Sequence, residues 1–135
     1  MSRLNDTRDA IISRLGEYLE NCDVKPLPKN PDNINLECTH KFATCFVGFN
    51  GASGDDREVS SQMALERWNV YVCIKSLGIV ENGYKVLDDI IAILSNREFE
   101  INGFVFYWTN TTARGYDTNQ WFFDIDFILP QMYEY

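Results

Sequence analysis

The alternation of apolar and polar side chains is clearest in the middle of the chain, in "LERWNVYVCIKS" (Leu65–Ser76). Successive side chains of a strand point to opposite faces, so every second residue shares a face. One face of this predicted strand is apolar, and the other mixes charged, polar and aromatic side chains. The apolar side consists of Trp68, Val70, Val72 and Ile74, and the other side of Arg67, Asn69, Tyr71, Cys73 and Lys75.

Two other segments repeat their apolar residues every three or four positions, which predicts amphipathic helices. The first helix runs from Leu4 to about Cys22, with Asn5 or Asp6 as the expected N-cap. The second spans Asn82–Asn96. The stripes expected to face the core are Leu4, Ile11, Ile12, Leu15, Tyr18 and Leu19 in the first helix, and Leu87, Ile90, Ile91 and Leu94 in the second.

The remaining segments complete an α+β fold. Lys41–Asn50 is rich in β-favouring residues and predicts a strand, followed by a polar loop, Gly51–Gln62. Phe99–Thr112 and Tyr116–Leu129 predict two long strands that pair through a turn at Ala-Arg-Gly. The order helix-strand-strand-helix-strand-strand predicts a mainly antiparallel four-stranded sheet packed against two helices.

The length of 135 residues predicts a single domain, 1–135. The net charge of −8 argues against a surface that grips nucleic acid, because phosphate binding needs clustered Lys and Arg. No apolar run approaches the roughly 20 residues of a membrane helix, and the N-terminus lacks the apolar core of a signal peptide. We therefore expect a protein that does not contact a membrane and stays in the cytoplasm, where it is made.

Metal and cofactor chemistry has few candidates in this sequence. Cys38, His40 and Cys45 lie close together and could ligate zinc, but a fourth ligand and paired spacing are missing. Buried thiols beside a loop histidine are therefore the favoured interpretation. No Gly-rich phosphate-binding motif occurs, and we expect no cofactor.

Asp124 and Asp126 interrupt the apolar run "WFFDIDFIL" near the C-terminus. In a strand they would share one face with Cα atoms about 6.5–7 Å apart, close enough to bind a metal or act as a catalytic pair. Their neighbours Phe123, Ile125 and Phe127 alternate with them and belong in the core, so the two acids are expected to face solvent without a metal. The sequence thus predicts no catalytic site.

Four segments resemble the small tail-terminator (tail-completion) proteins of long-tailed phages, including the Mu-like family. They are the opening helix "DAIISRLGEYL", the strand "ERWNVYVCI" after a polar Gly-rich loop, the helix "GYKVLDDIIAIL" and the closing hairpin that ends in "WFFDIDFIL". The resemblance extends from Leu4 to Leu129 and consists of pattern, size and order. The segment Asn21–His40 and the Gly51–Gln62 loop have no counterpart in it.

The resemblance implies a non-enzymatic virion protein that is assembled in the host cytoplasm. Its copies would form a ring, commonly a hexamer, that caps the tail tube at the correct length and then joins the tail to the head or neck. The implied partners are other copies of the chain, the tail-tube protein and a neck or head-completion protein. DNA would pass through the ring without specific binding.

Two groups of residues are candidate sites in this hypothesis. The polar loop is expected to be mobile in the free subunit and to order against a neighbour or the tube, with Gly51, Gly54, Asp55, Asp56, Arg57 and Glu58 as its contact residues. Asp124 and Asp126 would form an acidic face that lines the lumen. Two alternatives stay open: an acidic adaptor or DNA-mimic inhibitor that binds a basic protein, and a metal-dependent hydrolase that uses the two aspartates.

Overall fold

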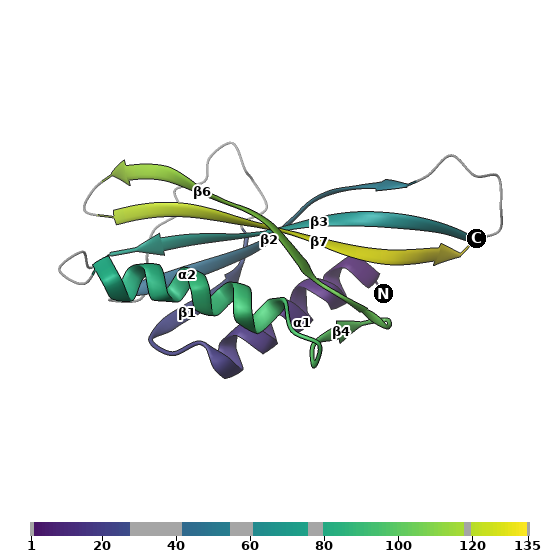
Figure 1. Ribbon diagram of the computed structural model, residues 1–135, viewed down its shortest axis with the longest axis horizontal. Coiled ribbons are helices and arrows are strands. Elements are labelled where there is room, and N and C mark those ends of the chain that lie inside the picture. Colours follow the sequence, from purple (N-terminus) through teal and green to yellow (C-terminus); the bar gives the residue numbers. More distant parts are fainter. Residues whose placement is uncertain (1, 28–41, 55–60, 76–79, 118–119, 135) are drawn as a thin grey trace.

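The computed structural model describes residues 2–27, 42–54, 61–75, 80–117 and 120–134 of the chain. Two helices, α1 (Arg3–Tyr18) and α2 (Val80–Leu94), pack on one face of a long sheet (Figure 1). In chain order the strands are β1 (Cys22–Pro26), β2 (Ala43–Gly54), β3 (Ser61–Ile74), β4 (Glu100–Ile101), β5 (Phe104–Val105), β6 (Tyr107–Asp117) and β7 (Gln120–Glu134).

The main sheet differs from the predicted one. The chain is α+β with two helices, but the sheet has five strands in the order β1-β2-β3-β7-β6, and β4 and β5 form a separate two-stranded sheet. β1 pairs in parallel with β2, so the sheet is mixed, and the predicted four-stranded antiparallel sheet is wrong. The sequence pattern does not reveal β1 because this strand is only five residues long and ends at Pro26.

The core lies between the helices and one face of the sheet. Trp68, Val70, Val72 and Ile74 are at most 2% exposed, which confirms the predicted register of β3. They share one buried cluster with side chains from both helices and from the neighbouring strands. The helical members of that cluster are Ile11, Leu15 and Leu19 at α1, and Val86, Leu87, Ile90 and Leu94 in α2.

The start and the apolar stripe of α1 both differ from the prediction. Ser2 is the N-cap, and its hydroxyl accepts a hydrogen bond from the backbone N–H of Asn5 at 3.2 Å. Tyr18 is exposed and stacks under the guanidinium of Arg14, whereas Thr7 occupies a buried position of the stripe. The capped start extends α1 toward the sheet and brings Arg3 into its first turn.

The segment predicted as one long strand before the last turn is divided among three strands, β4, β5 and the start of β6. A tight turn at Asn102 and Gly103, both with positive φ, joins β4 to β5, and β6 begins only at Tyr107. Ala113–Gly115, predicted as the hairpin turn, lies within β6 at a register shift against β7. Gly115 has a φ of +128°, so a glycine taken as a turn signal instead accommodates a β-bulge.

The predicted loop Gly51–Gln62 is also partly strand. β2 continues to Gly54 and β3 begins at Ser61, so Gly51 and Gly54 belong to the sheet. Gly51 has a φ of +113° at a register shift between Phe49 and Ala52. The other four candidate loop residues, Asp55, Asp56, Arg57 and Glu58, lie outside the described residues.

β3 and β7 form the long axis of the sheet. They pair over the whole of β3, from Ser61 opposite Glu134 to Ile74 opposite Trp121. Fourteen paired residues correspond to about 45 Å. β6 pairs with β7 only as far as Ile128, whereas β2 accompanies β3 as far as Ala64, so β3 and β7 project beyond β6, with the end of β2 along one edge, at the end of the molecule that carries the C-terminus (Figure 1). We call this projecting part, residues 61–67 and 128–134, the ribbon.

Candidate interaction surfaces

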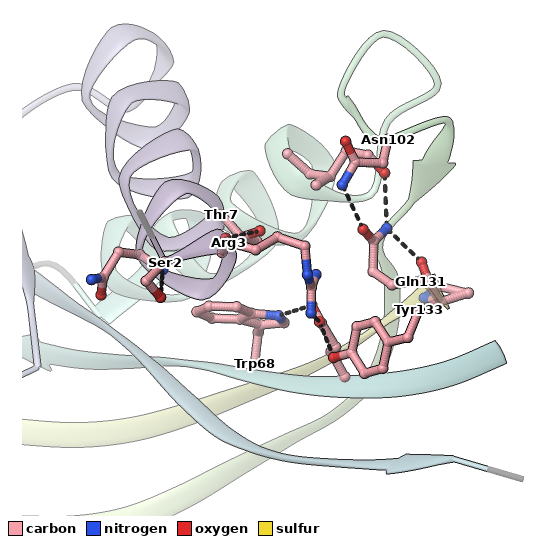
Figure 2. A network of polar contacts seen from close by, with 11 residues as sticks. Ser2, Arg3, Thr7, Trp68, Asn102, Gln131 and Tyr133 are labelled. Carbon is pink, nitrogen blue, oxygen red and sulfur yellow. Dashed lines mark hydrogen bonds and ion pairs between the residues drawn. The ribbon is translucent and has the colours of Figure 1, made fainter. Parts of the chain in front are cut away.

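A polar network lies at the base of the ribbon, on the face that carries the helices (Figure 2). Its centre is the fully buried carboxylate of Glu66, which accepts hydrogen bonds from Trp68 Nε1 at 3.2 Å and Tyr133 Oη at 2.5 Å. Arg3 donates from Nη2 to the same carboxylate, and its guanidinium carbon lies 4.4 Å from the centre of the Tyr133 ring. The network joins α1 to both strands of the ribbon.

Burial and the Glu66 charge set the protonation of this network. Burial lowers the pKa of Arg3, but its hydrogen bond and charge interaction with Glu66 outweigh that effect and raise the pKa above its ordinary value. Burial and the same carboxylate raise the pKa of Tyr133 above 10.0. Both side chains therefore stay protonated donors at neutral pH, and the arrangement is suited to holding α1 on the ribbon.

A second set of hydrogen bonds attaches the β4–β5 hairpin to β7. The buried Gln131 accepts from Asn102 Nδ2 at 2.9 Å and donates to the carbonyl oxygens of Ile101 and Pro130 at 2.9 and 2.7 Å. Neither Gln131 nor Glu66 is predicted as an important residue from the sequence. The signal for each is a polar side chain on the apolar side of an otherwise regular alternation.

Two hollows flank the first turns of α1. One, of about 300 Å³, lies against the β4–β5 hairpin and is lined by Arg3, Asp6, Thr7, Glu100, Ile101 and Asn102. The other, of about 190 Å³, lies against β2 and is lined by Leu4, Asn5, Arg8, Leu27, Val47, Gly48, Phe49 and Trp68. Both are shallow and open, so they suit contact with a protein surface better than enclosure of a small molecule.

The two aspartates of β7 lie on the sheet face opposite the helices, as predicted, but the expectation that both face solvent is wrong. Asp124 is 2% exposed. Asn69 Nδ2 donates to Asp124 Oδ1 at 2.9 Å and to Asp126 Oδ1, and Arg114 Nη2 lies 2.7 Å from Asp124 Oδ2. Arg114 lies at the register shift of β6, in a segment that the sequence predicts as a turn, and its side chain reaches Asp124 although Thr112 is the residue opposite Asp124.

The close approach of the two carboxylates affects Asp126. Its pKa is raised above the ordinary 3.8 by burial first and by the neighbouring Asp124 second. Burial and Asp124 likewise raise the pKa of Tyr71, which lies directly opposite Asp124 on β3. Asp124 is thus neutralised within the subunit, and Asp126 is the half-buried member of the pair.

The zinc candidates are only partly described. Cys45 is fully buried in β2, within the core cluster, whereas Cys38 and His40 lie outside the described residues. Across the ranges that the structure describes, no three His, Cys, Asp or Glu side chains group closely enough to hold a metal ion.

Two apolar patches are exposed at opposite ends of the long sheet. On the ribbon, Leu65 is 42% and Met132 46% exposed, on the face away from the helices. Register places them beside further apolar side chains of the same face, so the ribbon patch is Met63, Leu65, Ile128, Pro130 and Met132. In the sequence, this patch could be recognised from apolar residues that occupy the polar side of the alternation in these two strands.

The second patch lies where α2 begins and the β6–β7 hairpin ends. Tyr84 and Tyr116 are more than half exposed, and Trp121 is 37% exposed. The Tyr116 and Trp121 ring centres are 5.0 Å apart, and Tyr84 meets the edge of Phe123 at 6.4 Å. We call Tyr84, Tyr116 and Trp121 the aromatic patch.

Comparison with known proteins gives no family: the sequence matches no protein-family model and no curated protein. Within the described residues, neither helix is long and apolar enough to cross a membrane.

Proposed function

We propose that the chain is a structural subunit of a phage tail, a tail terminator whose copies form a ring, a hexamer in its commonest form, on the end of the tail tube. The ring stops tube growth and presents a surface to the neck or head-completion protein. It acts through shape and contact rather than by catalysis. The protein then resides in the virion, at the junction of tail and neck.

The ribbon is the observation that carries this proposal. It projects from the sheet and exposes large apolar side chains, Leu65 and Met132, on the face that no helix covers. Exposed apolar patches of this kind mark protein–protein contacts. The Arg3–Glu66 contact holds the ribbon to α1 and the Asn102–Gln131 contact holds it to the β4–β5 hairpin, so the ribbon can present its face in a fixed orientation.

Charge supports a ring through which DNA passes. The net charge of −8 reduces adhesion to the DNA backbone. Asp124 adds little to such a surface because Arg114 neutralises it, so Asp126 is the remaining candidate of the pair for an acidic lumen. The burial of Asp124 and Glu66 also removes two carboxylates from any surface pattern that could mimic DNA, which favours the ring over the acidic inhibitor.

Growth of tail tubes tests the proposal. Tube protein encoded beside this chain is polymerised with and without the purified chain, and tube lengths are measured by electron microscopy. We expect short tubes with one blocked end when the chain is present. Equal length distributions in both samples, with the chain absent from tube ends, would refute the proposal.

A further inference from the structure

The ribbon patch and the aromatic patch lie at opposite ends of the long sheet and on opposite faces. Met132 pairs with Met63 near one end of β3, and Trp121 pairs with Ile74 at the other. The aromatic patch is on the helix face, because Ile74 and Trp121 share the face that packs on the helices. Figure 1 shows the start of α2 and the β6–β7 hairpin at the end of the molecule opposite the C-terminus.

Building on the proposed ring, we infer that the ribbon patch of one copy docks on the aromatic patch of the next copy. Two different patches then form one contact, which is heterologous. Each copy keeps one free patch after it binds a neighbour, so the same contact can repeat. A repeated heterologous contact closes into a ring when the rotation between copies divides a full turn.

The chemistry of the two patches is complementary. The ribbon patch has two methionine thioethers, and the exposed Arg67 lies beside Leu65 on the same strand, opposite Ile128. Thioethers and guanidinium groups both bind favourably to aromatic rings. The aromatic patch supplies three such rings, so each of the two patches carries groups that the other can bind.

Charge agrees with the same pairing. Asp88 is exposed on α2, one helical turn after Tyr84, and places a carboxylate beside the aromatic patch. Neither Arg67 nor Asp88 forms an ion pair within the described part of the chain. A cation at one end and an anion at the other favour contact between unlike ends over contact between like ends, which matters for a chain with a net charge of −8.

The aromatic rings are already held in place in the single subunit. Tyr116 packs on Trp121, and Tyr84 packs on Phe123, so few rotamers are lost when a neighbour docks. Preorganised aromatic side chains are typical anchors of protein interfaces.

Two double variants test this contact, and each of them blocks one of the two patches. Leu65→Glu/Met132→Glu blocks the ribbon patch, and Tyr84→Glu/Tyr116→Glu blocks the aromatic patch. Gly16→Glu/Tyr18→Glu is the charge-matched control, because both residues are exposed on α1 outside the two patches. Circular dichroism and thermal melting establish that each variant is folded before its association is measured.

Sedimentation equilibrium of the purified chains, up to millimolar concentration, gives the readout. We expect the wild type and the control to form closed oligomers and each end-blocked variant to bind at least tenfold more weakly. The decisive sample is an equal mixture of the two end-blocked variants, in which one intact contact remains and the largest species should have twice the mass of the chain.

Other results would overturn the inference. If one blocked variant alone still dimerises, the contact is isologous. If the mixture stays monomeric, or if the wild type is monomeric throughout, the two patches do not bind each other and their occupant is a different protein. The terminator proposal is judged separately, by the tube-length assay, so the two can fail independently.

Discussion

Arg3, in the first turn of α1, neutralises the carboxylate of Glu66, which lies 63 residues later in β3 and is fully buried. The contact joins the N-terminus of the chain to the base of the ribbon. A buried carboxylate without a cation would cost several kcal/mol, so the ribbon and α1 are energetically coupled. The orientation of the proposed contact surface therefore depends on a residue at the very start of the fold.

Arg3→Ala should destabilise the protein by roughly 3 kcal/mol, the lower end of the range for breaking a buried ion pair, because the Arg3 side chain is 37% exposed. The double variant Arg3→Ala/Glu66→Gln removes the unpaired charge and should recover a large part of the loss. Urea unfolding of the three proteins measures both effects. A double variant as unstable as Arg3→Ala would show that lost packing, not charge, is the cause.

Asp124→Asn and Asp126→Asn should change the stability of the protein in different directions, although the two residues are neighbours on one face. Loss of the Asp124 charge weakens its bond to Arg114 and should cost roughly 1.5 kcal/mol, the lower end for charged hydrogen bonds because Arg114 is exposed. Asp126→Asn should slightly stabilise the protein at pH 7, because it removes the repulsion between two close carboxylates. Thermal unfolding at pH 7 compares them.

The pH dependence of the free energy of unfolding separates the contribution of Asp126 from those of other residues. Its pKa is higher in the folded chain than the ordinary 3.8, so the folded state binds the proton more tightly. The free energy of unfolding should therefore fall as the pH rises from about 3.8 through the raised folded value, and stay lower above it. In Asp126→Asn this fall is absent, so the stability difference between variant and wild type should grow with pH across that window. A pH-independent difference would contradict the raised pKa.

The sequence predicts the elements whose two faces differ strongly and misses the rest. The alternation from Trp68 to Ile74 is sufficient to place β3 in the core. β1 is missed because a parallel edge strand of five residues has little alternation to detect. Asp124 is expected in solvent because its partners, Asn69 and Arg114, come from two other strands, and a single strand pattern contains no information about them.

Two glycines should respond to alanine with opposite signs. Gly51 has a φ of +113° at the bulge in β2, a conformation that side chains disfavour, so Gly51→Ala should cost about 1 kcal/mol or more. Gly16 is exposed within α1 and has no atom within 4 Å of the position that an alanine Cβ would take. Gly16→Ala should therefore add up to about 1 kcal/mol through helix propensity. Chemical denaturation measures both, and a stabilised Gly51→Ala protein would contradict the bulge.

The largest loss of stability is expected for a substitution in the core. Ile90 is fully buried in α2 against the central strands, and Ile90→Ala should cost about 2–5 kcal/mol. Lys85→Ala on the exposed side of the same helix is the control and should leave the unfolding midpoint unchanged, because its ion pair with Asp89 is at the surface. Similar losses in both variants would contradict the assigned packing face of α2.

The candidate contact loop gives a functional prediction. Asp55→Asn/Asp56→Asn/Glu58→Gln should leave the unfolding midpoint unchanged and weaken the arrest of tube growth. Asp6→Asn/Asp9→Asn/Glu17→Gln, which removes three negative charges from exposed positions of α1, is the matched control and should arrest growth normally. Normal arrest by the loop variant would exclude these three acids as contacts with the tube.

Electron microscopy of tube ends is the decisive measurement for the terminator role. Tubes grown with the purified chain are imaged end-on and side-on, and the terminal density is compared with that of tubes grown alone. We expect a closed ring of chain copies, six in the commonest form, on one end of each arrested tube. Tube ends of identical structure in both samples, with the chain remaining in solution, would show that the protein is not a terminator.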